Sequence, residues 1–138
     1  MNKITLSLGL TVVVACLNVS AEDYKVDASK LPPVAARKGV TFDADIKPIL
    51  EKSCVKCHSG EKPKGKYSME SLAGVIKGGK DYGAAVIAGK SAASPMVGFA
   101  SDLVADMEMP PTDKRDKFPA LSKDQVGLIR AWIDQGAK

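Results

Sequence analysis

The 138-residue chain is poor in aromatic residues and has only one histidine. Aromatic residues make up 5% of the sequence, so a core built from side chains alone would be thin, and a buried cofactor would help to fill it. Structural zinc sites need four ligands, usually cysteines and histidines in two pairs. Because the chain has one closely spaced pair of cysteines and a single histidine, a zinc-binding module would lack ligands.

A long apolar run is also missing, since a membrane-spanning helix needs about 20 apolar residues. The N-terminal run covers only residues 4–15, after Lys3, and small or compact residues follow at positions 19–21. This arrangement predicts a secretory signal over residues 1–21, cleaved after Ala21, and therefore an exported, periplasmic protein.

Residues 13–16 offer an alternative processing route, because they resemble a bacterial lipobox. In that route an acylated Cys16 would become the new N-terminus and anchor the protein to a membrane; otherwise Cys16 leaves with the signal. Neither route gives Cys54 a disulfide partner other than Cys57. The chain is therefore not a disulfide-rich exported domain.

The rest of the sequence indicates an arm followed by one helical domain. Residues 22–40 contain prolines and mixed charges without a clear period, which predicts a linker or a wrapping N-terminal arm. Residues 41–138 have a length that suits one domain. Their apolar residues recur at helical spacing, and the breaks between them are rich in Gly and Pro. No strand pattern is evident, so the predicted fold class is all-α.

The first helix of this domain is predicted within residues 41–54. Either Asp43 or Asp45 can cap its start, because a carboxylate accepts bonds from free backbone N–H groups. With Asp45 as the cap, Pro48 falls in the first turn, where its missing N–H does least harm. The expected apolar face carries Ile46, Ile49 and Leu50.

Three further helices have recognisable ends. Ser68 is the expected cap of a short helix, and a second helix is expected to start at Ser94 and to cover residues 95–107. The C-terminal helix begins with a capping box formed by Ser122 and Gln125. Its predicted apolar face carries Val126, Ile129 and Ile133.

The segment at residues 53–58 reads SCVKCH and suits three chemistries. A thioredoxin-type disulfide would need a βαβ pattern around it, and zinc would need more ligands. The third chemistry is covalent attachment of c-type haem, for which C-x-x-C-H is the signature. Cys54 and Cys57 would then form thioethers with the haem vinyl groups, and His58 would be the proximal iron ligand. Export favours haem, because c-type haem is attached outside the cytoplasm.

A sixth iron ligand must come from a residue other than histidine, since His58 is the only one. Methionine thioether is the common alternative in electron-transfer cytochromes. Met96 is interpreted as a core residue that fills a gap. Met109 directly precedes two prolines, which stiffen the backbone and help it to present one side chain across a haem face. Met109 is the predicted distal ligand, with Met107 as the alternative.

Several motifs occur together in a characteristic order: C-x-x-C-H at residues 54–58, M-P-P at 109–111 and W-I-D-x-G-A at 132–137. In this combination the chain resembles the planctomycete-type cytochrome c domain, a class I-like c-type cytochrome, over residues 41–138. The resemblance implies a small cytochrome c-like helical fold around one covalently bound haem c. It also implies the same haem attachment and the same axial ligands, here Cys54, Cys57, His58 and Met109.

These observations predict a periplasmic monohaem cytochrome that carries single electrons through Fe(III)/Fe(II) with His/Met ligation, and not an enzyme. One alternative is a haem enzyme or small-ligand sensor with an open distal site. The other is a zinc or disulfide binding module.

The charge distribution bears on partners. The formal net charge is +4, and six lysines lie between Lys47 and Lys66 against only Glu51 and Glu61. This run is either a solvated face or a patch that steers acidic redox partner proteins. Nucleic acid is not a predicted partner, because no binding motif is present and aromatic residues are not interleaved with the lysines. Membrane contact is expected only if Cys16 is lipidated.

Overall fold

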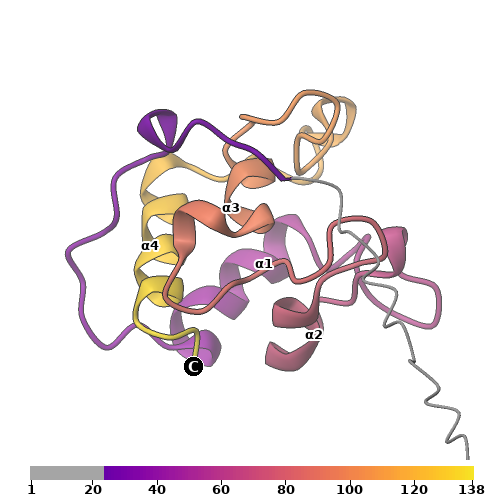
Figure 1. Cartoon of the computed structure of the whole chain (residues 1–138). Coiled ribbons are helices and arrows are strands. Elements are labelled where there is room, and N and C mark those ends of the chain that lie inside the picture. Colours follow the sequence, from indigo (N-terminus) through magenta and orange to yellow (C-terminus); the bar gives the residue numbers. More distant parts are fainter. Residues whose placement is uncertain (1–23) are drawn as a thin grey trace, which may run out of the picture.

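The computed structural model describes residues 24–138, and every regular element within this range is helical (Figure 1). The α-helices are α1 (Lys47–Ser53), α2 (Leu72–Lys77), α3 (Pro95–Ala100) and α4 (Lys123–Asp134). Shorter helical turns are η1 (Ala28–Lys30), η2 (Phe42–Ile46), η3 (Lys64–Lys66), η4 (Ser91–Ala93) and η5 (Thr112–Lys114). Because residues 24–138 contain no strand, the predicted all-α class is confirmed.

The predicted signal at residues 1–21, and Cys16 within it, lie outside the described residues. The longest helix of the described part, α4, has 12 residues, whereas a membrane span needs about 20. None of the helices between residues 24 and 138 combines the length and hydropathy of a membrane span.

The first helical run starts with the π-helical turn η2 and continues as α1. Pro48 lies in the first turn of α1, as predicted, where its missing N–H costs least. The cap differs from the prediction, because Asp45 lies inside the run and its carboxylate accepts the N–H of Thr41 at 2.9 Å. Ile46 and Leu50 are both fully buried, so the predicted apolar face does form the core.

The cap of α4 confirms the predicted capping box. The hydroxyl of Ser122 accepts the backbone N–H of Gln125 at 3.2 Å, and Oε1 of Gln125 accepts the N–H of Ser122 at 2.9 Å. Two backbone donors that the helix leaves free are thereby satisfied. The buried face of the helix includes Val126, Ile129, Trp132 and Ile133.

The two ends of the domain pack together through aromatic rings. The ring centroids of Phe42 and Trp132 are 5.8 Å apart, and Trp132 is fully buried. The carbonyl of Lys138 accepts both the backbone N–H of Phe42 at 3.1 Å and the indole N–H of Trp132 at 3.0 Å. Because α1 leads directly into the cysteine motif, this packing positions the motif relative to the core.

The segment before the domain, residues 24–40, runs over the outside of α4 (Figure 1). Leu31 and Val40 are buried in the same core as the helices. The N–H of Ala35 also donates to the carbonyl of Gly127 in α4 at 3.0 Å. The described part of this segment is therefore packed against the domain.

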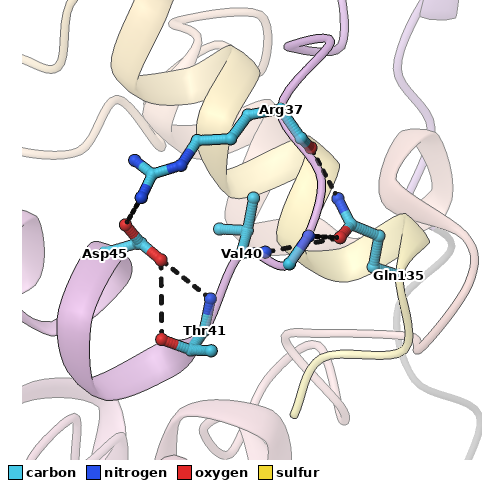
Figure 2. Close-up of polar contacts among 6 residues, drawn as sticks. Arg37, Val40, Thr41, Asp45 and Gln135 are labelled. Carbon is cyan, nitrogen blue, oxygen red and sulfur yellow. Dashed lines mark hydrogen bonds and ion pairs between the residues drawn. The ribbon is translucent and has the colours of Figure 1, made fainter.

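A polar cluster joins the end of this segment to the C-cap of α4 and to η2 (Figure 2). The Gln135 side chain donates to the carbonyl of Arg37 at 2.9 Å and accepts the N–H groups of Gly39 and Val40 at 2.8 and 3.3 Å. The guanidinium of Arg37 lies 2.6 Å from the carboxylate of Asp45, whose side chain is only 7% exposed. The cluster connects three segments that are distant in sequence.

Two helix boundaries differ from the prediction. The cap of α2 is Ser71, whose hydroxyl accepts a backbone N–H of the first turn, and not Ser68. α3 begins where predicted but ends at Ala100 instead of Met107. The reason is local backbone geometry, since Asp102 has a φ of 57°, which a right-handed helix cannot contain.

Asp45→Ala is expected to lower the free energy of unfolding by about 1–3 kcal/mol, because it removes a buried carboxylate that bonds Arg37 and Thr41. Asp43→Ala is the matched control, since Asp43 lies on the same turn but is exposed. It should change stability by less than about 0.5 kcal/mol. Urea unfolding followed by circular dichroism measures both. Equal stability of the two variants would contradict the role given to the cluster.

Candidate haem site

A cavity of about 360 Å³ lies beside the C-terminal end of α1. Its volume is in the range of about 300–1,000 Å³ that is typical of small-molecule and cofactor sites. Its wall is formed by the end of α1, the loop before α2, the segment between α2 and α3, α3 itself, and the segment between α3 and α4. The structure brings all the sequence-predicted site residues to this wall: Cys54, Cys57, His58 and Met109.

The C-x-x-C-H motif forms one turn that continues α1. The N–H of Cys54 donates to the carbonyl of Leu50 at 2.7 Å, as in a helix. The N–H groups of Cys57 and His58 both donate to the carbonyl of Cys54, at 3.1 and 3.2 Å. This compact turn allows two sulfur atoms and one imidazole to line the same cavity.

The imidazole of His58 is held in one tautomer. Its Nδ1 lies 3.1 Å from the carbonyl oxygen of Lys64 and 3.1 Å from that of Tyr67. Because carbonyl oxygens only accept hydrogen bonds, Nδ1 must carry the proton, which leaves Nε2 with a free lone pair. A hydrogen bond of this kind orients metal-binding histidines and makes them more basic ligands. Burial lowers the pKa of His58, which favours the neutral imidazole that can bind a metal.

Tyr67 supports this arrangement from a loop to which the sequence analysis gave no function. Its ring packs against the imidazole of His58, with 5.3 Å between centroids, and its hydroxyl donates to the carbonyl of Val75 in α2 at 2.9 Å. Burial raises the pKa of Tyr67, so the hydroxyl remains a donor. Sequence reasoning missed Lys64 and Tyr67 because every residue has a carbonyl, and only the path of the loop brings these two to Nδ1.

The environment of the cysteines disfavours the two alternative chemistries. Cys54 and Cys57 are free thiols, and burial raises the pKa of Cys54 to about 12. Redox-active cysteines in C-x-x-C motifs instead have lowered pKa values. In the chain from residue 24 onward, no cluster of three or more His, Cys, Asp or Glu side chains could hold a metal ion, so zinc lacks a ligand set.

Met109 is held on both sides of its position in the cavity wall. Its N–H donates to the carbonyl of Phe99 in α3 at 3.0 Å. The carbonyl of the next residue, Pro110, accepts a bond from Nε of Arg115, also at 3.0 Å. Met107 lines the cavity too, but its N–H bonds only within its own loop. The supported backbone therefore favours Met109 over Met107 as a fixed ligand.

Two other methionines line the cavity in different surroundings. Met96 is 6% exposed and belongs to the hydrophobic core, in agreement with its interpretation as a core residue. The N–H of Met69 donates to the carbonyl of His58 at 2.7 Å, which places Met69 next to the predicted proximal ligand. Met69 is buried as well, at 7% exposure, and belongs to the same hydrophobic core as Met96.

The remaining wall is mostly apolar and contains most of the chain's few aromatic residues, namely Tyr67, Tyr82, Phe99 and Phe118. Phe99 is central, with Tyr82 at 5.0 Å and Tyr24 at 5.8 Å between ring centroids, both in edge-on contact. Such a lining suits the apolar faces of a planar macrocycle. The lining agrees with the expectation that a cofactor completes a thin core.

These residues fit haem c. Two thiols on one turn suit the two vinyl groups, a neutral imidazole with a free Nε2 and a thioether are suitable iron ligands, and the apolar wall suits the macrocycle. An all-α fold with a C-x-x-C-H turn beside such a cavity defines the class of c-type cytochromes.

Comparison with protein families gives a more specific result. The family model of planctomycete cytochrome C matches residues 54–113. This range begins at the first cysteine of the motif and includes the M-P-P segment. Over this range the resemblance drawn from the sequence is therefore confirmed, and the matching part of the chain is similar to c-type cytochromes of the planctomycete type, a family that implies covalently bound haem c.

No curated protein matches the chain. Among solved structures, a chain of Kuenenia stuttgartiensis hydrazine synthase is similar, with 28% sequence identity and a TM-score of 0.40. The match covers 71% of this chain and 16% of that chain. This chain therefore corresponds to a small part of that longer one.

Tyr67→Phe is expected to lower the free energy of unfolding by about 1–3 kcal/mol, because it leaves the carbonyl of Val75 without its donor. Tyr82→Phe makes the same chemical change elsewhere in the cavity wall and should cost less than about 0.5 kcal/mol. Chemical denaturation of the haem-loaded protein measures both. If Tyr82→Phe lowered the free energy of unfolding as much as Tyr67→Phe does, the proposed role of Tyr67 in supporting His58 would be contradicted.

Proposed function

We propose that the protein is an exported monohaem c-type cytochrome that carries single electrons and is not an enzyme. One observation carries this proposal. Two thiols, an imidazole with its Nδ1 held by carbonyls, and a thioether on a supported segment all line one cavity. The sequence contains one C-x-x-C-H motif, which supports one haem per chain.

Haem c bound in this cavity supplies a one-electron Fe(III)/Fe(II) couple. Cys54 and Cys57 would hold it covalently and prevent its loss. His58 would present Nε2 to the iron, and Met109 would present its thioether. Because hydrogen bonds hold the imidazole of His58 and the backbone around Met109, both residues would remain ligands in either oxidation state and little would rearrange on electron transfer.

The residues around the proposed haem would favour the reduced, Fe(II) state. A thioether ligand raises the reduction potential relative to a second histidine. The wall around Phe99 and Tyr82 is apolar, and the polarity of the shell around a metal also controls its potential. We therefore infer that the protein accepts electrons readily and passes them to an acceptor of higher potential.

Met109→Ala is expected to lower the midpoint potential, abolish the thioether-to-iron(III) charge-transfer absorption and allow strong CO binding by the ferrous protein. Met107→Ala is the matched control and should change none of these three properties. Redox titration and optical spectroscopy measure them. The mass of the same preparation reports the bound haem and the N-terminus, either Glu22 after cleavage or an acylated Cys16.

Two results would argue against this proposal. Strong CO binding by the unaltered protein would support the open-site haem enzyme or sensor. Loss of the charge-transfer absorption in Met107→Ala, and not in Met109→Ala, would assign the distal ligand to Met107.

We also propose that the redox partner is an acidic protein. Lys64, Lys80 and Lys114 lie at the cavity wall, and all three are exposed. Lys80 and Lys114 are within salt-bridge distance of Asp81 and Asp113, respectively. Lys56 and Lys62, near the cysteine motif, are also exposed and extend the positive surface. Positive charge at the mouth of the site would steer a negatively charged partner toward the haem.

Small charged reagents test this idea without a known partner. Oxidation of the ferrous protein by anionic ferricyanide should slow as ionic strength rises, because salt screens the attraction. Lys64→Glu should weaken that salt dependence, while Lys123→Glu, in α4 and not part of the cavity wall, should alter it less. Rates that are independent of salt in the unaltered protein would rule out the patch.

A further inference from the structure

The segment that carries Met109 is a loop that leaves α3 and returns to it. The carbonyl of Phe99, in the last turn of α3, accepts the N–H of Asp102 at 3.4 Å and the N–H of Met109 at 3.0 Å. Both ends of the loop therefore meet at one oxygen atom. The N–H of Leu103 also donates to the carbonyl of Gly98 in α3 at 3.1 Å, so the backbone alone holds the loop to α3 through a few hydrogen bonds.

Arg115 adds a second closure from outside the loop. Its Nη1 and Nη2 lie 2.9 and 2.6 Å from the two carboxylate oxygens of Asp102, and its Nε donates to the carbonyl of Pro110 at 3.0 Å. One planar guanidinium thus joins the first residues of the loop to the residue directly after Met109. The Arg115 side chain is 26% exposed, so it is largely packed against the protein.

The residue types suit this geometry. A guanidinium can bond two carboxylate oxygens in parallel and still donate from Nε, whereas an ammonium group is a point charge without that planar shape. Asp102 has a φ of 57°, a left-handed conformation that aspartate and asparagine adopt more readily than most residues. The neighbouring Lys114 is instead exposed and lies 2.7 Å from Asp113, so it takes no part in this closure.

We propose that Arg115 and Asp102 form a clamp that positions Met109 and resists its displacement from the iron. This inference rests on the proposed function, in which Met109 is the distal ligand. In this proposal, a competing ligand displaces the thioether by moving the loop away from α3. The clamp must break when it does so, and its hydrogen bonds therefore add to the cost of displacement. Arg115 and Asp102 are positioning residues, since neither belongs to the cavity wall.

The test uses imidazole as the competing ligand for the ferric, haem-loaded full chain. Arg115→Gln, Arg115→Lys and Asp102→Asn should each bind imidazole about tenfold more tightly than the unaltered protein. The double variant Arg115→Gln/Asp102→Asn should bind it no more tightly than the stronger single variant, because both changes break the same clamp. The titration is monitored by the loss of the thioether-to-iron(III) charge-transfer absorption.

Lys117→Gln is the matched control, because it removes one positive charge from the same segment at an exposed position. It should leave the imidazole affinity unchanged. Thermal unfolding of each variant separates a general loss of stability from a specific effect on the ligand. If Arg115→Gln does not fold, Asp102→Asn still tests the clamp, since asparagine keeps the side-chain shape and tolerates the same backbone conformation.

The outcomes separate this inference from the proposed function. In one outcome, the charge-transfer absorption disappears in Met109→Ala, but all clamp variants and the control bind imidazole with equal affinity. This outcome would overturn the clamp and leave Met109 as the proposed ligand. An absorption that is unchanged in Met109→Ala would overturn the distal role of Met109, and the clamp with it. Tighter imidazole binding in Lys117→Gln, equal to that in Arg115→Gln, would show an effect of net charge and also overturn the clamp.

Discussion

The candidate site depends on the pair of hydrogen bonds that hold the imidazole of His58. The carbonyls of Lys64 and Tyr67 converge on Nδ1, and neither can donate, so the tautomer is set by the fold. Nε2 is then left with its lone pair before any metal arrives. The orientation of the proximal ligand is therefore a property of the protein, which reduces what must be ordered when haem is attached.

This pair of bonds depends in turn on helix packing. α1 presents the cysteine motif, and the contact of Phe42 with Trp132 holds the start of this helical run against α4. α2 holds Tyr67 through the carbonyl of Val75. The few aromatic residues of the chain are thus used at two kinds of place, the contact between the terminal helices and the wall of the cavity, where Phe99 is central.

The two predicted iron ligands are held by contacts of different range. His58 follows its cysteines directly, and one turn of backbone hydrogen bonds brings the three side chains to one cavity. Met109 is positioned by contacts with Phe99 and Arg115, which belong to other segments. For this reason the C-x-x-C-H motif could be interpreted from sequence alone, whereas the choice between Met107 and Met109 rested on two prolines. The structure adds a physical difference between them, since only the segment of Met109 is held on both sides.

Local signals allowed much of the fold to be predicted, including the all-α class and the capping box of α4, because caps and helical periodicity involve near neighbours in sequence. The predicted cap of α2 and the predicted end of α3 were wrong. Ser68 and Ser71 are equally suitable caps by residue type. The left-handed Asp102, which ends α3, is paired with Arg115, which is distant in sequence. By itself the sequence determined which thiols, imidazole and thioethers are available and how they are spaced. Only the tertiary structure decided which carbonyls face His58 and which methionine segment is supported, because backbone groups are chemically alike along the chain and only folding brings particular ones together.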